Sequence, residues 1–304
     1  MASLKSGKDP AEPFHPGRVF PITGARLAHL YQELVLLFAQ TVNNLSMGDS
    51  CRNYKAVVDR ITPEDTLITF NWDVILDRVL WESGRWDPGE GYGISFGYIL
   101  DGTWQPSESR EMKSELKLLK LHGSTNWLEP YVAFDLRDGR RKWIFRPGTA
   151  SVPVCYVNCD TDLPSYHDMY TPGGPFCYGF PPNHPELPES GYLYPMIVAP
   201  SLIKYYEDLP LSHLWAEATQ RLRRSGHIVV VGYSFPPTDK MAWDLIREAA
   251  TVPGRRLNIT LVGPAPEPVA ERLKERLVGA VELRIRHETF EDFAKAFGKG
   301  KPIF

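Results

Sequence analysis

The stretch HIVVVGYSFPPTDKMAWDLIREAA, residues 227–250, decides the fold class of this chain. It begins with a continuously apolar, β-branched run, turns at Gly232, and continues after two prolines into an amphipathic pattern. A short apolar run that ends in a glycine turn predicts a buried strand, and a helical period after it predicts a helix. We therefore expect a strand over 227–231 followed by a helix over 239–250.

The same alternation extends from this stretch in both directions. Strands are predicted over 66–70, 116–121, 196–199, 257–262 and 281–285, and helices over 25–43, 54–60, 73–82, 211–224, 267–277 and 290–297. Continuously apolar strands that alternate with helices are typical of a parallel sheet with both faces covered. The sequence thus predicts an α/β fold on a doubly wound parallel sheet, with its ligand at the carboxyl ends of the strands.

Two segments interrupt this order. Residues 1–23 are rich in Pro, Gly and Lys without a period, and we interpret them as a tail or loop. Residues 129–195 hold eleven of the 27 prolines and three of the four cysteines, which predicts a small irregular, proline-rich insertion or second module. The α/β core is then expected to comprise residues 24–128 and 196–304.

Composition excludes several classes of protein. The chain has 304 residues, of which 43% are hydrophobic and 23% charged, as in soluble globular proteins. A net charge of -3 provides no basic field for non-specific nucleic-acid binding. We find neither an apolar run long enough to span a membrane nor a secretion signal, and we expect a cytoplasmic protein.

Polar side chains stand at two of the predicted strand ends. Asn71 and Asp73 follow the strand over 66–70, and His122 follows the strand over 116–121. Asparagine both donates and accepts hydrogen bonds, and histidine titrates nearest neutral pH, so both suit catalysis. Local alternatives stay open, because Asn and Asp are ordinary helix caps and the histidine could be a packed, hydrogen-bonded core residue.

Glycines also stand at the predicted strand ends. Gly123, next to His122, would let a ligand or another backbone approach closely. Gly232 and Ser234 lie between a strand and a helix start, where free N–H groups suit phosphate or ribose oxygens. Gly263 follows the strand over 257–262. Each of these turns, taken alone, is also compatible with a purely structural role.

Taken together, these junctions resemble the sirtuin-like superfamily, most closely its divergent bacterial branch linked to phage defence. The resemblance extends over about residues 67–264. The motifs that carry it are Phe70-Asn71-Trp72-Asp73, Lys120-Leu121-His122-Gly123-Ser124, Val198-Ala199-Pro200, and Gly232-Tyr233-Ser234 with Asp239.

The resemblance implies a Rossmann-like sheet that binds NAD as substrate or ligand. By analogy, Asn71 and Asp73 line the nicotinamide-ribose pocket, and His122 is the base that acts on a ribose hydroxyl or on water. The resemblance also implies cofactor-binding roles at three further positions: Gly232 and Ser234 for the ribose–phosphate part, and Gly263 for the adenosine end. Cleavage of the nicotinamide–ribose bond builds positive charge on the sugar, as glycoside cleavage does.

The N-terminus departs from the family pattern. The family opens with a strand and a Gly-Ala-Gly phosphate loop, whereas this chain offers only Ile22-Thr23-Gly24-Ala25, with no apolar strand before it. We therefore expect weak NAD binding and weak or undetectable turnover. This departure favours one alternative, a non-catalytic NAD- or nucleotide-binding module that regulates a protein partner.

The cysteines bear on a further alternative, an NAD-dependent protein deacylase. Such enzymes carry two Cys-x-x-Cys pairs for a structural zinc. Here Cys155, Cys159 and Cys177, with His167 or His184, could supply a Cys3His site, and Cys51 stands apart. This spacing favours scattered thiols, so we expect no metal, and the deacylase is less favoured than an NAD hydrolase.

Overall fold

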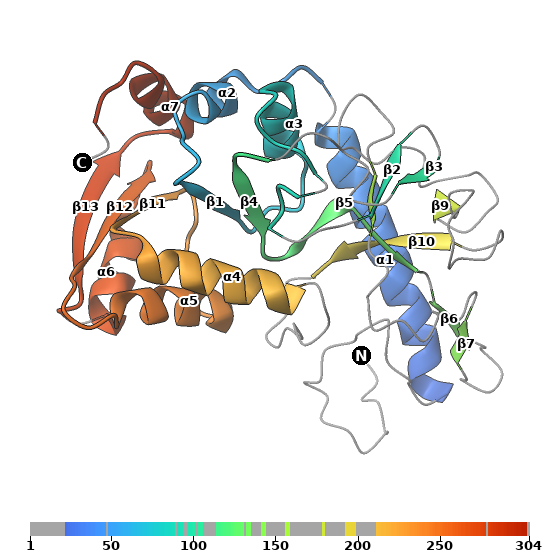
Figure 1. The fold of residues 1–304 in the computed structure, drawn as a ribbon. Coiled ribbons are helices and arrows are strands. Elements are labelled where there is room, and N and C mark those ends of the chain that lie inside the picture. The colour runs from blue at the N-terminus through green and yellow to red at the C-terminus, as the bar shows by residue number, and fades with distance from the viewer. Residues whose placement is uncertain are drawn as a thin grey trace.

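The chain has a mixed α/β fold (Figure 1). The computed structural model describes residues 22–46, 48–88, 90–93, 97–100, 103–105, 114–130, 132–134, 141–143, 156–158, 178–179, 192–198, 211–277 and 279–302. The helices are α1 (Ile22–Ser46), α2 (Arg52–Val58), α3 (Ile75–Glu82), α4 (Leu211–Arg224), α5 (Lys240–Ala250), α6 (Glu267–Arg276) and α7 (Phe290–Gly298).

Three parallel strands form the C-terminal sheet, in the order β11 (His227–Val231), β12 (Leu257–Gly263) and β13 (Val281–His287). All three were predicted, and β11 has the predicted bounds. Helix α6 packs against β13 and α7 against β12. β11 and β12 are mainly apolar runs that end at glycines, whereas β13 alternates apolar with charged residues, as suits a half-exposed edge strand.

A second parallel pair lies apart from this sheet. β1 (Thr66–Thr69) pairs with β4 (Lys117–Lys120), and α3 follows β1 in the chain. Within the described residues, β1 and β4 form a sheet of their own rather than one continuous sheet with β11–β13. Both groups share one hydrophobic core, which includes Leu118, Leu119, Leu214, Ile228 and Ile259.

The third major unit is a mixed sheet that was not predicted. Its order is β3 (Thr103–Gln105), β2 (Gly97–Leu100), β8 (Tyr156–Asn158), β5 (Gly123–Pro130), β10 (Tyr192–Ile197) and β9 (Tyr178–Gly179). A short hairpin of β6 (Val132–Phe134) and β7 (Arg141–Trp143) lies beside it. The buried start of β5, Gly-Ser-Thr-Asn-Trp, lacks the apolar run that identifies a strand, so its pairing with β10 and β8 defines it.

This sheet corrects one predicted strand. Residues 196–199 were expected to lie in the parallel sheet, but 196–197 form the end of β10, which runs antiparallel to β5 with Ile197 opposite Gly123. The apolar run was recognised correctly, whereas its partner depended on contacts distant in sequence. The predicted boundaries between the core and the insertion lie between residues 128 and 129 and between residues 195 and 196. β5 crosses the first of these boundaries and β10 crosses the second.

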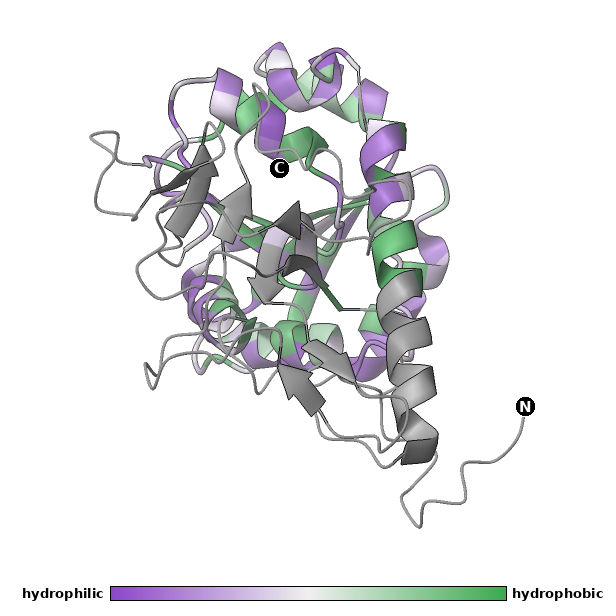
Figure 2. Ribbon diagram, turned by 90° about the vertical axis from the view of Figure 1, so that its right-hand side faces the viewer, coloured by the Kyte–Doolittle hydropathy of each residue, from purple (hydrophilic) through white to green (hydrophobic). Residues whose placement is uncertain are grey.

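Helix α1 starts earlier than expected. It begins at Ile22, so residues 22 and 23 are helical rather than part of a tail. It packs against β5, β6 and β10, and its Val35 and Ala39 are buried. Figure 2 shows helices in which hydrophilic and hydrophobic residues alternate. No helix among the described residues is both long and apolar enough to cross a bilayer.

Candidate functional site

Asn71 and His122 follow two paired strands at the same edge of the sheet. The register pairs Thr69 of β1 with Lys120 of β4, and each candidate residue lies two positions later. The Leu121 amide continues the pairing by donating to the Thr69 carbonyl at 3.0 Å. Asn71 is exposed, whereas His122 is 7% exposed. A buried histidine and an exposed asparagine therefore follow two paired strands at equivalent positions.

The two turns that carry these residues are tied together by hydrogen bonds. The Trp72 indole N–H donates to the His122 carbonyl at 3.1 Å. In the other direction, the Thr125 amide donates to the Trp72 carbonyl at 3.0 Å. The Lys120 ammonium donates to the Asp73 carbonyl at 2.5 Å. The Asn71–Asp73 turn is thus held against the start of β5.

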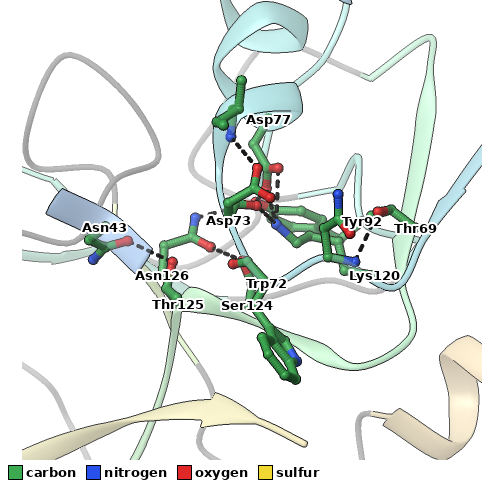
Figure 3. A network of polar contacts seen from close by, with 12 residues as sticks. Asn43, Thr69, Trp72, Asp73, Asp77, Tyr92, Lys120, Ser124, Thr125 and Asn126 are labelled. Carbon is green, nitrogen blue, oxygen red and sulfur yellow. Dashed lines mark hydrogen bonds and ion pairs between the residues drawn. The ribbon is translucent and has the colours of Figure 1, made fainter. Parts of the chain in front are cut away.

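A buried ionic network underlies this arrangement (Figure 3). Lys120 Nζ lies 3.0 Å from Asp77 Oδ2, and the two side chains are 0% and 1% exposed. The Tyr92 hydroxyl also donates to Asp77, and Asn126 donates to the Tyr92 oxygen at 3.3 Å. Burial raises the pKa of Asp77, an effect that the charge of Lys120 opposes. Neither member of this ion pair was assigned a role from the sequence.

Two aromatic rings lie near His122. The centroid of its ring lies 5.0 Å from that of Phe70 and 6.3 Å from that of Trp215. Phe70 in turn stacks on Tyr233, with centroids 4.3 Å apart, so the end of β1 meets the turn after β11. These rings bring the two parallel groups of strands into contact at the candidate site.

An acidic side chain also contacts His122. Asp239, just before α5, places Oδ2 3.4 Å from His122 Nε2, and both side chains are buried. The Tyr233 hydroxyl donates to the same carboxylate oxygen at 2.7 Å. Burial, followed by the contact with Asp239, raises the pKa of Tyr233. Asp239 was noted in the sequence only as part of a motif, and its contact with His122 was not predicted.

The remaining predicted residues have mainly local contacts. Asp73 Oδ1 accepts from the Ile75 amide at 3.0 Å in a turn just before α3, whose N-cap position is taken by Val74 without a side-chain bond. Gly232 has a φ of 68°, and a Cβ added there would have no atom within 4 Å, so a side chain would meet strain but no clash. The Gly232 amide donates to the Val262 carbonyl at 3.2 Å, next to Gly263. Ser234 is exposed, and its carbonyl accepts from Arg272 at 2.6 Å.

Gly123 allows another strand, rather than a ligand, to approach closely. Its φ is 78°, and a Cβ there would lie 2.1 Å from the Met196 carbonyl oxygen. The neighbour that approaches closely is therefore strand β10. Gly123 therefore has a structural role, because it lets β5 and β10 pack closely next to the candidate site.

The described residues include no group of three or more His, Cys, Asp or Glu side chains that could hold a metal ion. Cys155, Cys159 and Cys177, as well as His167 and His184, lie outside the described residues. Cys51 is a free, half-buried thiol. No protein-family model matches the chain, and no significant match was found among curated proteins.

Proposed function

We propose that this chain is a sirtuin-like NAD hydrolase that cleaves the nicotinamide–ribose bond, with His122 as its base. The observation that carries the proposal is the position of His122 beside Asn71 at the carboxyl edge of the parallel β1–β4 pair. Ligands of open α/β sheets bind at this edge. The proposal implies that β4–β1 and β11–β13 act as the two halves of one doubly wound, Rossmann-like arrangement.

The chemistry assigned to these residues is the attack of water on the ribose carbon. The carbon–nitrogen bond to nicotinamide breaks and its electron pair leaves with the ring, while a carbon–oxygen bond forms and the proton of the water passes to His122. Asn71, which is exposed and can both donate and accept, binds the substrate's polar groups. A positioned base of this kind contributes ~10²–10⁴-fold.

The proposed affinity for NAD is low. Ile22–Ala25 form the first turn of α1, where the resemblance would place a glycine-rich phosphate loop. Each charge-assisted hydrogen bond that is absent costs about 1.5–3 kcal/mol, and about 1.4 kcal/mol is tenfold in affinity. The loss of two or three such bonds moves a micromolar site towards millimolar.

Calorimetry with NAD and an assay for released nicotinamide test the proposal together. We expect weak binding and slow release that does not depend on an acetyl-lysine peptide. Asn71→Ala should weaken both, whereas Asn258→Ala, at an exposed position on β12, should leave both unchanged. Binding without release would instead identify a non-catalytic module, and release only with the peptide a deacylase. Absence of binding at millimolar NAD would overturn the proposal.

A further inference from the structure

Asp239 has an unusual position for a residue at the start of a helix. It directly precedes α5, where aspartate commonly caps the helix, yet its side chain makes no capping hydrogen bond to α5. Instead, the side chain is buried and directed at His122, just after β4, with Oδ2 3.4 Å from Nε2. Capping of α5 therefore does not account for this carboxylate.

We propose that Asp239, held in place by the Tyr233 hydroxyl, is the positioning residue that orients the imidazole of His122. As a statement about catalysis, this inference rests on the proposed function. As a statement about the state of the His122 ring, it can be tested in protein that has no activity.

A carboxylate next to an imidazole has two physical effects. It favours the tautomer with the proton on the facing nitrogen, here Nε2, which leaves Nδ1 as the nitrogen that can accept a proton. It also stabilises the imidazolium that forms when the base takes up that proton. Both effects act through His122, so Asp239 need not touch the substrate.

Tyr233 fixes the carboxylate for this task. Its hydroxyl donates to Asp239 Oδ2 at 2.7 Å. Its ring stacks on Phe70, which also contacts the His122 ring. The Asp239 carboxylate is thus restrained by Tyr233 and the His122 imidazole by Phe70, in addition to the contact between them.

The first experiment measures nicotinamide release. Asp239→Asn keeps the shape but removes the charge, and we expect kcat to fall by ~10–100-fold, as for the loss of an orienting partner, with KM little changed. Asp244→Asn is the matched control, because Asp244 lies on α5, close in sequence to Asp239, in an exposed pair with Arg247. In a His122→Ala background, Asp239→Asn should cause no further loss, since the carboxylate acts only through the imidazole. An equal loss in both backgrounds would overturn the proposal.

The second experiment does not need activity. Ring-nitrogen NMR of ¹⁵N-histidine-labelled protein, with the His122 signals assigned through His122→Ala, reports which nitrogen carries the proton. We expect the proton on Nε2 in the native protein, a change of tautomer in Asp239→Asn, and no change in Asp244→Asn. Tyr233→Phe removes only a hydroxyl and should shift the His122 signals in the same direction as Asp239→Asn. If Asp239→Asn does not fold, Tyr233→Phe alone tests the proposal. Unaltered signals in Tyr233→Phe and in any folded Asp239→Asn would contradict the proposal, even if NAD cleavage were established.

Discussion

His122 is the residue on which the proposed chemistry depends most directly. Its ring is buried among aromatic side chains, so removal of the imidazole deletes the base while the exposed amide of Asn71 stays in place. His122→Ala should lower NAD turnover by ~10²-fold or more and change the affinity less. Nicotinamide release and calorimetry measure the two effects. His213→Ala, at an exposed position on α4, is the control, and unchanged turnover in His122→Ala would exclude His122 as the base.

Gly123 is the residue whose backbone conformation joins the site to the mixed sheet. An alanine there combines a positive φ with a contact of 2.1 Å to the Met196 carbonyl, so β10 has to move. We expect Gly123→Ala to lower the free energy of unfolding by about 2 kcal/mol or more. Gly226→Ala is the matched control, because nothing lies within 4 Å of its Cβ position. Equal urea midpoints for the two variants would contradict this interpretation.

At the scale of elements, the Lys120–Asp77 pair links β4 to α3. Lys120→Met leaves a buried carboxylate without its cation, which costs about 3–5 kcal/mol, whereas the double variant Lys120→Met with Asp77→Leu should recover much of that loss. Lys117→Met is the control. Lys117 lies on the same strand but is only half-buried, and its ammonium donates to the Glu90 carbonyl in a solvent-exposed hydrogen bond. Chemical denaturation of the four proteins measures the effect.

The pH dependence of the Lys120→Met variant follows from the raised pKa of Asp77. A carboxyl with a raised pKa in the folded state contributes stability at low pH that is lost as the pH rises through that pKa. Removal of Lys120 raises the pKa further, because the opposing charge is gone. The difference in stability between native protein and variant should therefore shrink as the pH falls, and a constant difference would argue against a charged Asp77 in the variant.

At the scale of the whole molecule, three tyrosines make the fold sensitive to alkali. Burial is the first cause of a raised pKa at Tyr54, Tyr92 and Tyr233, and the pKa of Tyr54 is raised to about 12 from 10.0. The folded state then holds protons that the unfolded state releases, so stability is complete below pH 10 and falls above it. Each such group contributes a slope of about 1.4 kcal/mol per pH unit.

Thermal melts between pH 8 and pH 12 test this sensitivity. The melting temperature of the native protein should fall steeply above pH 10. Tyr54→Phe should make the decline shallower between pH 10 and about 12, because one titrating hydroxyl has been removed. If the native protein and the variant declined in parallel, Tyr54 would not be among the groups responsible.

Much of the element order follows from local sequence patterns. The predicted bounds of α4 and β11 agree with the structure, and the ends of α5, α6 and α7 agree to within one residue. The mixed sheet was not predicted, because its central strand β5 starts with small polar residues that are buried there only through pairing and hydrogen bonds. Local apolar periodicity cannot reveal such a strand.

The sequence by itself determined the α/β class, the parallel strands with their glycine turns, and the strand-end positions of Asn71 and His122. Those features depend on residues that are neighbours in the chain. Only the tertiary structure decided that Asp239 faces His122, that Lys120 pairs with Asp77, and that Gly123 packs on β10. Such contacts depend on register and packing between distant segments, and identical local patterns are compatible with many pairings, so no local rule selects among them.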